Sequence, residues 1–318
     1  MTELKRLARP KYSAFNARKE LVYMKRQQTK AEILRKMLGE DRMVLVAGAH
    51  DGLSAKLAEK HGFDAIWASG LGISALHTVP DASILSMTEF LQWAVMMNES
   101  CSLPVIADCD SGYGNIHNVR QMVEKYEAAK IAGICIEDKV FPKLNSFDDR
   151  QQVLVSVDEF CAKIRTAKYV QKDPDFTVIA RVEALIAGLG QEEAQYRARA
   201  YVEAGADAIL IHSKQKTPHE IIEFAKNWTL PVPLIVVPTK YPDITVKELK
   251  NLGIRMTIYA NQALRASVRA MDEALKRIRQ SGTTQVIEQE ICSVEEIFNL
   301  QNVAKMKEME QIIYGENK

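Results

Sequence analysis

The feature that most constrains the fold of this chain is a unit that recurs along it: a helix-like stretch, a glycine and then a short apolar run. Examples are LAEKHGFDAIWASG at residues 57–70 and YVEAGADAILIHSK at residues 201–214, with related units at 126–139 and 249–261. A glycine just past a helix readily adopts the left-handed conformation and ends the helix. An apolar run without polar alternation is typical of a strand buried on both faces of a parallel sheet.

Eight such apolar runs occur, and most of the segments between them are long enough for one helix each. They cover residues 43–49, 65–69, 105–108, 133–137, 177–181, 208–212, 234–238 and 256–260. Eight strands that alternate with helices predict an α/β fold of the (β/α)8, or TIM-type, barrel class. A doubly wound open sheet is the alternative, although no G-x-G-x-x-G motif follows the first run.

The two ends of the 318-residue chain differ from the repeating part. Residues 1–27 are basic and polar, and we predict an N-terminal arm there. Residues 28–318 are predicted to form one barrel domain that includes extra C-terminal helices. From about Ala263 the pattern is helical without a further strand, and Ser293 followed by Glu296 resembles a capping box. This tail exceeds what one barrel helix needs, so we expect it to pack on, or be swapped with, another subunit.

Charge and composition exclude several classes of function. The formal net charge is +1, so the chain lacks the excess of positive charge that is typical of proteins that bind nucleic acid. No apolar run approaches the roughly 18–20 residues that span a membrane, and no hydrophobic secretory segment is found at the start. The five cysteines form no C-x-x-C pair. We therefore expect reduced thiols and a cytoplasmic enzyme that acts on a small molecule.

Three acidic residues lie where two of the predicted strands end. Asp108 and Asp110 close the third strand, and Glu137 ends the fourth. In a barrel the C-terminal ends of the strands surround one mouth, where active sites form. Residues two apart on a strand share a face, so Asp108 and Asp110 are expected to point the same way. Three carboxylates so close need a cation, and oxygen ligands without cysteine or histidine favour Mg2+, with Mn2+ as the alternative.

Basic and amide side chains occur at the same mouth. Arg181 and His212 end the fifth and sixth predicted strands, and an arginine fork matches a carboxylate or phosphate. The stretch EDKVFPKLNSFDDRQ at residues 137–151 reads as a loop that is able to cover the site. In it Lys143 offers positive charge, and Asn145 and Ser146 offer hydrogen bonds, to a phosphoryl group.

Taken together, these residues resemble the phosphoenolpyruvate mutase branch of the isocitrate lyase superfamily, from about residue 30 to residue 300. The loop matches the specific pattern EDKxxxKxNS. Further matches are WASGL at 67–71, PD at 80–81, DCDSGYGN at 108–115, ARVEA at 180–184, ILIHSK at 209–214, VPTKY at 237–241 and AN at 260–261. The departures are small: Ser111 stands where threonine is commoner, and Phe147 stands where leucine is commoner.

The resemblance implies a role for each matching residue. Asp108 would bind Mg2+ directly, while Asp110, Glu137 and Asp81 would act through water or order the metal's shell. Arg181 and His212 would bind the phosphoryl group, and Lys143, Asn145 and Ser146 would close over it. The carboxylate end of the substrate would lie against a cradle made by four residues. These are Trp67, Ser69, Gly70 and Leu71.

The resemblance also implies a reaction and a partner. The reaction would interconvert phosphoenolpyruvate and phosphonopyruvate, with Mg2+ stabilising a pyruvate enolate, and the chain would form a homotetramer. The lyase branch uses a KKCGH-type loop, which is missing here. A phosphonopyruvate hydrolase is the first alternative, and relatives of that kind usually carry threonine where Asn145 stands, so Asn145 favours the mutase. A non-catalytic barrel that binds a keto acid is the second alternative.

Overall fold

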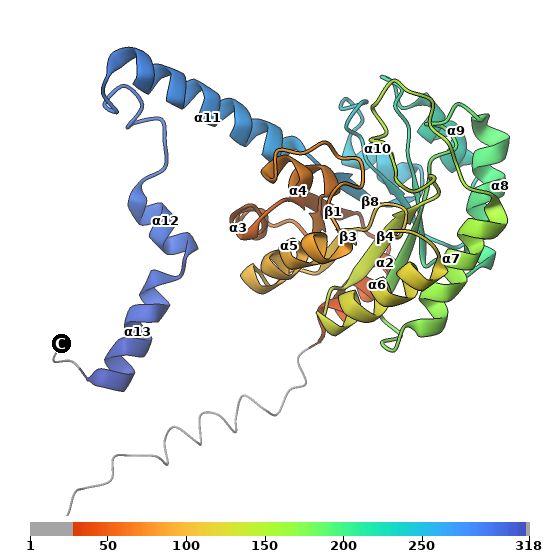
Figure 1. Ribbon diagram of the computed structural model, residues 1–318, viewed down its shortest axis with the longest axis horizontal. Coiled ribbons are helices and arrows are strands. Elements are labelled where there is room, and N and C mark those ends of the chain that lie inside the picture. The colour runs from red at the N-terminus through yellow and green to blue at the C-terminus, as the bar shows by residue number, and fades with distance from the viewer. Residues whose placement is uncertain (1–27, 316–318) are drawn as a thin grey trace, which may run out of the picture.

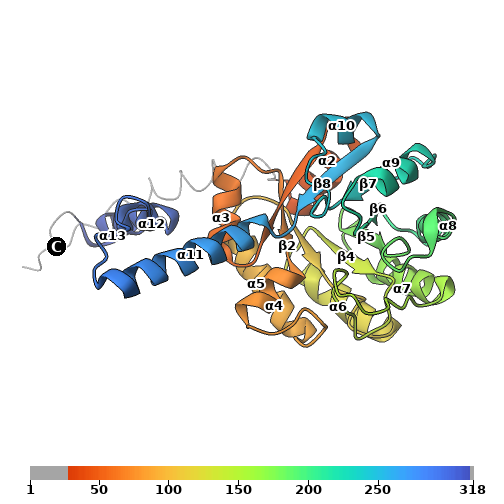
Figure 2. The same ribbon diagram turned by 90° about the horizontal axis from the view of Figure 1, so that it is seen from above.

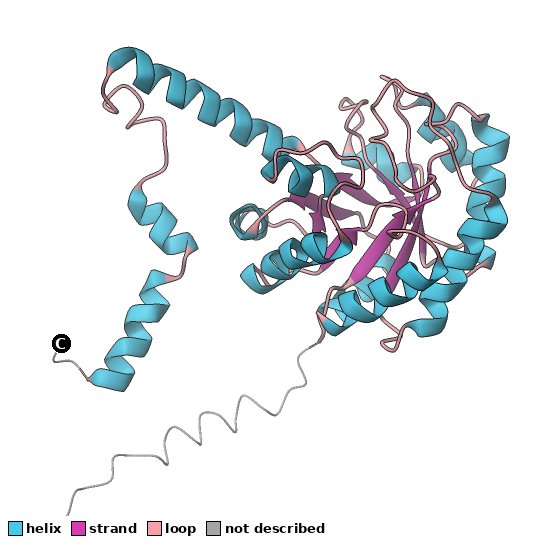
Figure 3. Ribbon diagram, in the orientation of Figure 1, coloured by secondary structure: helices cyan, strands magenta, loops and turns pink. Residues whose placement is uncertain are grey.

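The computed structural model describes residues 28–315 and contains a closed barrel of eight parallel strands in the order β1 to β8 (Figures 1 and 3). The strands are β1 Val44–Ala49, β2 Ala65–Ala68, β3 Val105–Asp108, β4 Gly133–Glu137, β5 Thr177–Val182, β6 Ala208–Ile211, β7 Leu234–Val236 and β8 Ile254–Tyr259. All eight predicted strands are confirmed, with ends that move by one or two residues. The predicted arm at residues 1–27 lies outside the described residues.

The helices of residues 28–315 lie around the barrel as an outer layer, as Figure 2 shows from above, except the last three, which extend away from it. The helices are α2 Lys30–Gly39, α3 Gly52–Lys60, α4 Gly70–Leu76, α5 Met87–Ser100, α6 Ile116–Ala128, α7 Val157–Val170, α8 Gly190–Glu203, α9 His219–Lys226, α10 Val246–Asn251, α11 Gln262–Ser281, α12 Val294–Leu300 and α13 Val303–Tyr314. Helix α2 packs Leu34 and Leu38 against the residues that fill the barrel. A second, larger core lies between the strands and the outer helices.

The glycines of the repeating unit mostly behave as expected. Gly62, Gly205 and Gly253 have φ of 74°, 108° and 81°, the left-handed conformation that ends each preceding helix. The unit at residues 126–139 differs, because Lys130 takes the left-handed conformation with φ 59° and Gly133 is the first residue of β4. Glycine is needed there for space, since a Cβ atom would lie 2.7 Å from the backbone oxygen of Thr177 on β5.

The C-terminal helices α11, α12 and α13 extend away from the barrel (Figures 1 and 2). None of their residues is buried, and the predicted capping box at Ser293 is confirmed. Val268, Met271 and Leu275 follow helical spacing on α11 and are 53%, 56% and 67% exposed. This leaves an apolar stripe on α11 open to solvent. Among the helices of residues 28–315, none is long and apolar enough to span a bilayer.

The closeness of β1 to the start of α11 generates a prediction about Gly48. A Cβ atom at this position would lie 2.0 Å from the backbone oxygen of Ala260, which cannot move without breaking the barrel. We expect Gly48→Ala to lower the free energy of unfolding by about 1–3 kcal/mol or more in urea titrations. Gly39→Ala is the control, because no atom lies within 4 Å of its added methyl group. Equal stability of the two variants would contradict the packing described here.

Candidate active site

The barrel brings the predicted site residues to one mouth, at the C-terminal ends of the strands. Asp108 is the last residue of β3 and Glu137 the last of β4, while Arg181 is paired with Glu137 in the β4–β5 register. His212 directly follows β6, and Trp67 lies on β2. Five separate strands thus contribute side chains to one region, because parallel strands all point their carboxyl ends the same way.

The acidic side of the mouth forms around Asp108 and Asp110. The prediction that strand alternation aligns these two residues is wrong, because β3 ends at Asp108 and Asp110 lies in a turn with φ 49°. The turn nevertheless brings them together, since a Cβ atom on Gly70 would lie 3.0 Å from Asp108 Oδ2 and 3.6 Å from Asp110 Oδ1. The Gly70 N–H also donates to Asp108 Oδ2 at 3.3 Å. Burial raises the pKa of Asp108 to about 7.

Lys143 reaches into this acidic cluster from the lid loop, which we define as residues 138–156. Its Nζ lies 2.8 Å from Asp81 Oδ1 and 3.1 Å from Asp110 Oδ1, and the side chain is only 5% exposed. Burial alone lowers the pKa of Lys143, but the carboxylates of Asp110 and Asp81 outweigh it and raise that pKa well above its ordinary value. Ser83 also links the lid loop to the acidic cluster, because its hydroxyl accepts a hydrogen bond from the Lys143 N–H and donates one to Asp110.

The donor set in this cluster has the chemistry that Mg2+ prefers. Asp110 Oδ1 and Glu137 Oε1 are buried, and within the described residues a lysine ammonium lies near each of them, that of Lys143 at 3.1 Å and that of Lys139 at 3.6 Å. No three acidic, histidine or cysteine side chains of residues 28–315 converge closely enough to hold an ion directly. Mg2+ usually keeps several waters and takes only one or two carboxylates, so this arrangement fits it. The assignment of Asp108 as direct ligand, and of Asp110 and Glu137 as ligands through water, stays a prediction.

The basic side of the mouth is organised by Glu183, a fully buried residue that is the fourth of the ARVEA motif. Its Oε1 accepts from Arg181 Nε at 2.6 Å and lies 2.8 Å from His212 Nδ1. Its Oε2 accepts from the Ser146 hydroxyl at 2.6 Å and lies 3.1 Å from Lys139 Nζ. Burial by itself raises the pKa of Glu183, but Arg181 and Lys139 hold that pKa well below its ordinary range. One carboxylate therefore orients three predicted phosphoryl-binding groups.

His212 lies between a carboxylate and a guanidinium. Its Nδ1 is 2.8 Å from both Glu183 Oε1 and Arg181 Nη2. A protonated Nδ1 donates to the carboxylate, and an unprotonated Nδ1 accepts from the guanidinium. Burial, followed by the positive charge of Arg181, lowers the pKa of His212. His212 is thus expected to be neutral at pH 7, with Nε2 left for a ligand.

The lid loop is anchored behind the mouth by a buried ion pair. Asp138 Oδ2 accepts from the Tyr201 hydroxyl at 2.7 Å and from Arg197 Nη1 at 3.1 Å, both on α8. Asp138 Oδ1 accepts from the Glu183 N–H at 2.9 Å. At the front, Asn145 Nδ2 donates to Asp81 Oδ2 at 2.6 Å. The loop is therefore fixed at its base on α8 and at its tip on the opposite rim.

A cavity of about 50 Å3 lies beneath the lid loop. All of the predicted site residues line this cavity except Gly70, Asp110 and Glu137. The cavity also includes residues that sequence reasoning did not assign. These are Phe147, Val237, Thr239, Ala260 and Asn261. The sequence analysis also assigned no role to Glu183 and Lys139, although both lie in the motifs that it quoted. Glu183 directly follows the strand that carries Arg181, and this position could have identified it as a site residue.

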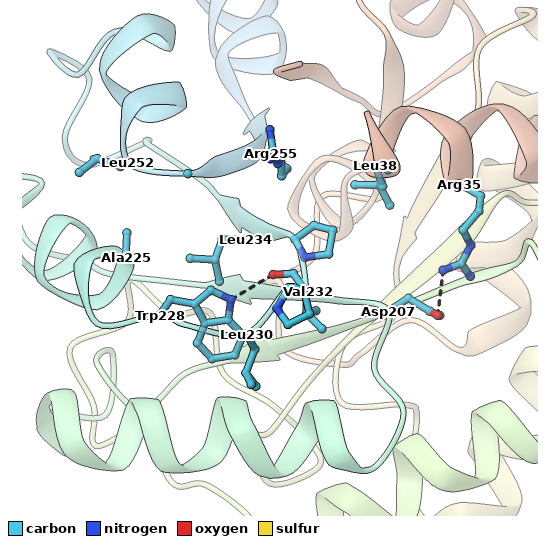
Figure 4. A pocket seen from close by; sticks show the side chains of 14 residues that line it. Arg35, Leu38, Asp207, Ala225, Trp228, Leu230, Val232, Leu234, Leu252 and Arg255 are labelled. Carbon is cyan, nitrogen blue, oxygen red and sulfur yellow. Dashed lines mark hydrogen bonds and ion pairs between the residues drawn. The ribbon is translucent and has the colours of Figure 1, made fainter. Parts of the chain in front are cut away.

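A second hollow, of about 430 Å3, lies at the opposite, N-terminal end of the barrel beside α2 (Figure 4). It is lined by Trp228, Leu230 and Leu252, and Arg35 at its edge is paired with Asp207 at 2.9 Å. No predicted site residue reaches it. The N-terminal face of such barrels serves stability, so the chemistry is expected at the mouth that holds Asp108.

Comparison with known proteins decides the family. A family model described as phosphoenolpyruvate phosphomutase matches residues 34–279. The chain belongs to the PEP mutase/isocitrate lyase superfamily. It is therefore an enzyme of this superfamily, as its motifs predicted, and the non-catalytic alternative loses its support.

Three matches to superfamily members extend over nearly all of the barrel. The chain is 48% identical over 284 residues to the phosphonopyruvate hydrolase of Variovorax sp. (strain Pal2), covering 89% of this chain and 98% of the relative. A crystal structure of phosphoenolpyruvate phosphomutase from Streptomyces platensis subsp. rosaceus has a TM-score of 0.88 and 49% identity, covering 88% and 98% of the two chains. A phosphonopyruvate hydrolase crystallised with oxalate and Mg2+ has a TM-score of 0.85 and 48% identity, covering 89% and 98%.

The acidic cluster generates a prediction about metal binding. We expect Asp108→Ala to weaken Mg2+ binding by at least about 100-fold, since loss of an outer-sphere partner alone costs about 10- to 100-fold. Isothermal titration calorimetry with Mg2+ measures the change. Asp243→Ala is the matched control, because Asp243 is exposed and lies outside the cavity lining. Wild-type Mg2+ affinity in Asp108→Ala would refute the ligand assignment.

Proposed function

We propose that this enzyme is a Mg2+-dependent phosphoenolpyruvate mutase that interconverts phosphoenolpyruvate and 3-phosphonopyruvate. The observation that carries the proposal is the fixed position of Asn145 over a small cavity. Its Nδ2 donates to Asp81 and its Oδ1 accepts from the Phe147 N–H at 3.0 Å. The second hydrogen on Nδ2 is left for a ligand in the cavity, which Asn145 lines.

The proposed reaction needs no second reactant. In the forward direction the P–O bond of phosphoenolpyruvate breaks and a P–C bond forms to C3 of the same pyruvate unit, so all atoms stay in one molecule. When bound, Mg2+ would stabilise the negative charge of the pyruvate enolate. Phosphoryl transfer of this kind depends on positioning and electrostatic stabilisation more than on covalent catalysis.

The chain's own residues supply that positioning. Arg181 and His212, both held by Glu183, would bind the phosphoryl oxygens from one side. Ser146 donates its single hydroxyl hydrogen to Glu183 and accepts from Arg181, so it would keep these two groups in position. Asn145 would donate to the phosphoryl oxygens from the lid loop. The amides at the start of α4, with Trp67, would hold the carboxylate of the substrate at the opposite end of the cavity. The phosphoryl group thus stays in place while the enolate presents first oxygen and then carbon.

Exclusion of water separates this reaction from hydrolysis. Lys143, Asn145 and Ser146 close the cavity from the lid loop, and its free volume is about 50 Å3. A water molecule beside the phosphoryl group would attack phosphorus and yield phosphate and pyruvate instead. The second candidate function is therefore phosphonopyruvate hydrolysis, favoured by the 48% identity to the hydrolase of Variovorax sp. (strain Pal2).

The direct test of the proposal is a 31P NMR time course with purified protein, Mg2+ and phosphonopyruvate. We expect the phosphonopyruvate signal to be replaced by that of phosphoenolpyruvate. Inorganic phosphate with an equal amount of pyruvate would show that the hydrolase assignment is right and the mutase assignment wrong.

Asn145 provides a sharper prediction in the same assay. Asn145→Ala removes a donor aimed at the phosphoryl group, and loss of one such donor costs about 10²- to 10³-fold in kcat. We expect turnover to fall by that factor, or the product to shift toward phosphate, with the fold intact by circular dichroism. Asn227→Ala, at the exposed end of α9, is the control. Wild-type turnover and product in Asn145→Ala would contradict the role of the lid loop.

We further propose that the enzyme is a homo-oligomer, a tetramer as the family resemblance implies, whose subunits pack through the C-terminal helices. The support is the exposed apolar surface on α11, α12 and α13, which includes Met271, Leu275 and Ile312 at 56%, 67% and 66% exposure. Contiguous apolar surface of this kind is rarely left open in soluble monomers. A second copy of the chain would cover it.

Light scattering coupled to size exclusion tests this proposal. We expect the full-length chain to elute with the mass of a tetramer. The double variant Met271→Glu, Leu275→Glu places two charges in the apolar stripe and is expected to yield smaller species, whereas Arg269→Glu on the same helix is expected to leave the mass unchanged. A monomeric wild-type chain would refute the proposal.

A further inference from the structure

Lys163 is a buried lysine on α7 that does not line the cavity beneath the lid loop. On the same helix Phe160, Ile164 and Ala167 form the buried stripe that packs into the larger core, and Lys163 lies on that stripe between them. The residue is 1% exposed. Lysine is almost never fully buried without a partner, because its ammonium loses its hydration there. The burial of this side chain therefore needs a reason other than packing.

The partner of Lys163 is a main-chain carbonyl beside the acidic cluster. Its Nζ donates to the carbonyl oxygen of Ser111 at 3.0 Å. Within residues 28–315 its ion pair is with Glu159, a longer contact of 3.9 Å to a side chain that is 55% exposed. The contact with Ser111 is thus the short and buried one. Because its acceptor belongs to the main chain, serine and threonine at position 111 offer it equally.

Ser111 lies in the turn that follows β3. The Gly112 N–H donates to the Cys109 carbonyl at 2.9 Å, which closes a four-residue turn with Asp110 and Ser111 at its centre. Asp110 has φ 49°, a left-handed conformation that is unfavourable for a residue with a Cβ atom. Such a conformation persists only where the surrounding structure holds it. The turn that carries Asp110 therefore needs support from neighbouring elements.

Two contacts supply this support from two sides of the turn. The Glu137 N–H on β4 donates to the Asp110 carbonyl at 2.8 Å. From α7, Lys163 donates to the next carbonyl, that of Ser111. The two central carbonyls of the turn are thus held by a strand and by a helix. The side chain of Asp110 remains directed at the acidic cluster, where its Oδ1 lies 3.1 Å from Lys143 Nζ.

We propose that Lys163 is a positioning residue for the Mg2+ site: by holding the Ser111 carbonyl, it keeps Asp110 beside Asp108. Asp108 depends less on this contact, because it is part of β3 and is paired in register with Cys135 on β4. The inference rests on the proposed Mg2+-dependent function and deepens its metal site. It concerns the binding of the ion and not the product, so its test is separate from the choice between isomerisation and hydrolysis.

The test is the Mg2+ affinity of Lys163→Met, measured by isothermal titration calorimetry. Methionine fills a similar space but cannot donate to the Ser111 carbonyl. We expect the affinity to fall about 10-fold, the lower end of the 10- to 100-fold range for residues that orient metal ligands. The sign of the change is decisive, because loss of a nearby positive charge would by itself strengthen the binding of a cation. Unchanged or tighter Mg2+ binding would overturn the proposal.

Lys168→Met is the matched control on the same helix. Lys168 is paired with Asp207 at 2.9 Å, so its substitution removes an ion pair from α7 without touching the turn after β3. We expect wild-type Mg2+ affinity in this variant, and an equal loss in both variants would overturn the proposal. Replacement of a buried charge by an apolar side chain is often neutral for stability. Should urea titrations show that Lys163→Met is unfolded, Lys163→Gln takes its place, because glutamine is too short to reach Ser111, and the same fall is expected.

A double-mutant cycle with Asp110 tests how the effect reaches the ion. In a protein that already carries Asp110→Ala, the carboxylate that Lys163 positions is absent. We therefore expect Lys163→Met to weaken Mg2+ binding less than about twofold in that background. Equal factors in the two backgrounds would show that Lys163 does not act through Asp110 and would overturn the proposal. The 31P NMR products of the wild-type enzyme decide separately between mutase and hydrolase.

Discussion

The site depends on one buried carboxylate, that of Glu183. It accepts hydrogen bonds from Arg181 and Ser146, lies against His212 Nδ1, and is paired with Lys139 at 3.1 Å. An isolated buried carboxylate is very costly, so this arrangement persists only because the opposite charges and donors are all present. The same contacts that neutralise Glu183 fix Arg181, Ser146 and His212, which come from three elements, relative to one another.

The acidic and basic halves of the mouth are separate but joined through the lid loop. Lys143 is paired with Asp81 and Asp110 on the acidic side, and three residues further on Ser146 is bound to Glu183 on the basic side. A short loop segment therefore closes both halves at once. The barrel therefore covers its mouth without a separate lid domain. In the proposed function, this is the segment that would keep water from the phosphoryl group.

The sequence predicted the parts of this structure that depend on local patterns. Eight apolar runs, four of them in units with a glycine, predict the barrel, and the strand ends predict which residues meet at the mouth. The parts that were missed depend on three-dimensional contacts. Asp110 joins Asp108 through a left-handed turn and not by strand alternation. Glu183 looked like an ordinary strand-end acid, because its partners come from residues up to 44 positions away in the chain, such as Lys139.

The measurement that tests the central claim most directly is the turnover of Glu183→Asp by 31P NMR, with unfolding followed by circular dichroism. Aspartate keeps the negative charge that balances Arg181 and Lys139 but withdraws it by one methylene. Misplacement of catalytic groups by about 1 Å costs on the order of 100-fold in rate. We therefore expect kcat to fall about 100-fold while the protein stays folded at the assay temperature. Near-wild-type turnover in folded Glu183→Asp would contradict the claim that this carboxylate positions the phosphoryl-binding groups.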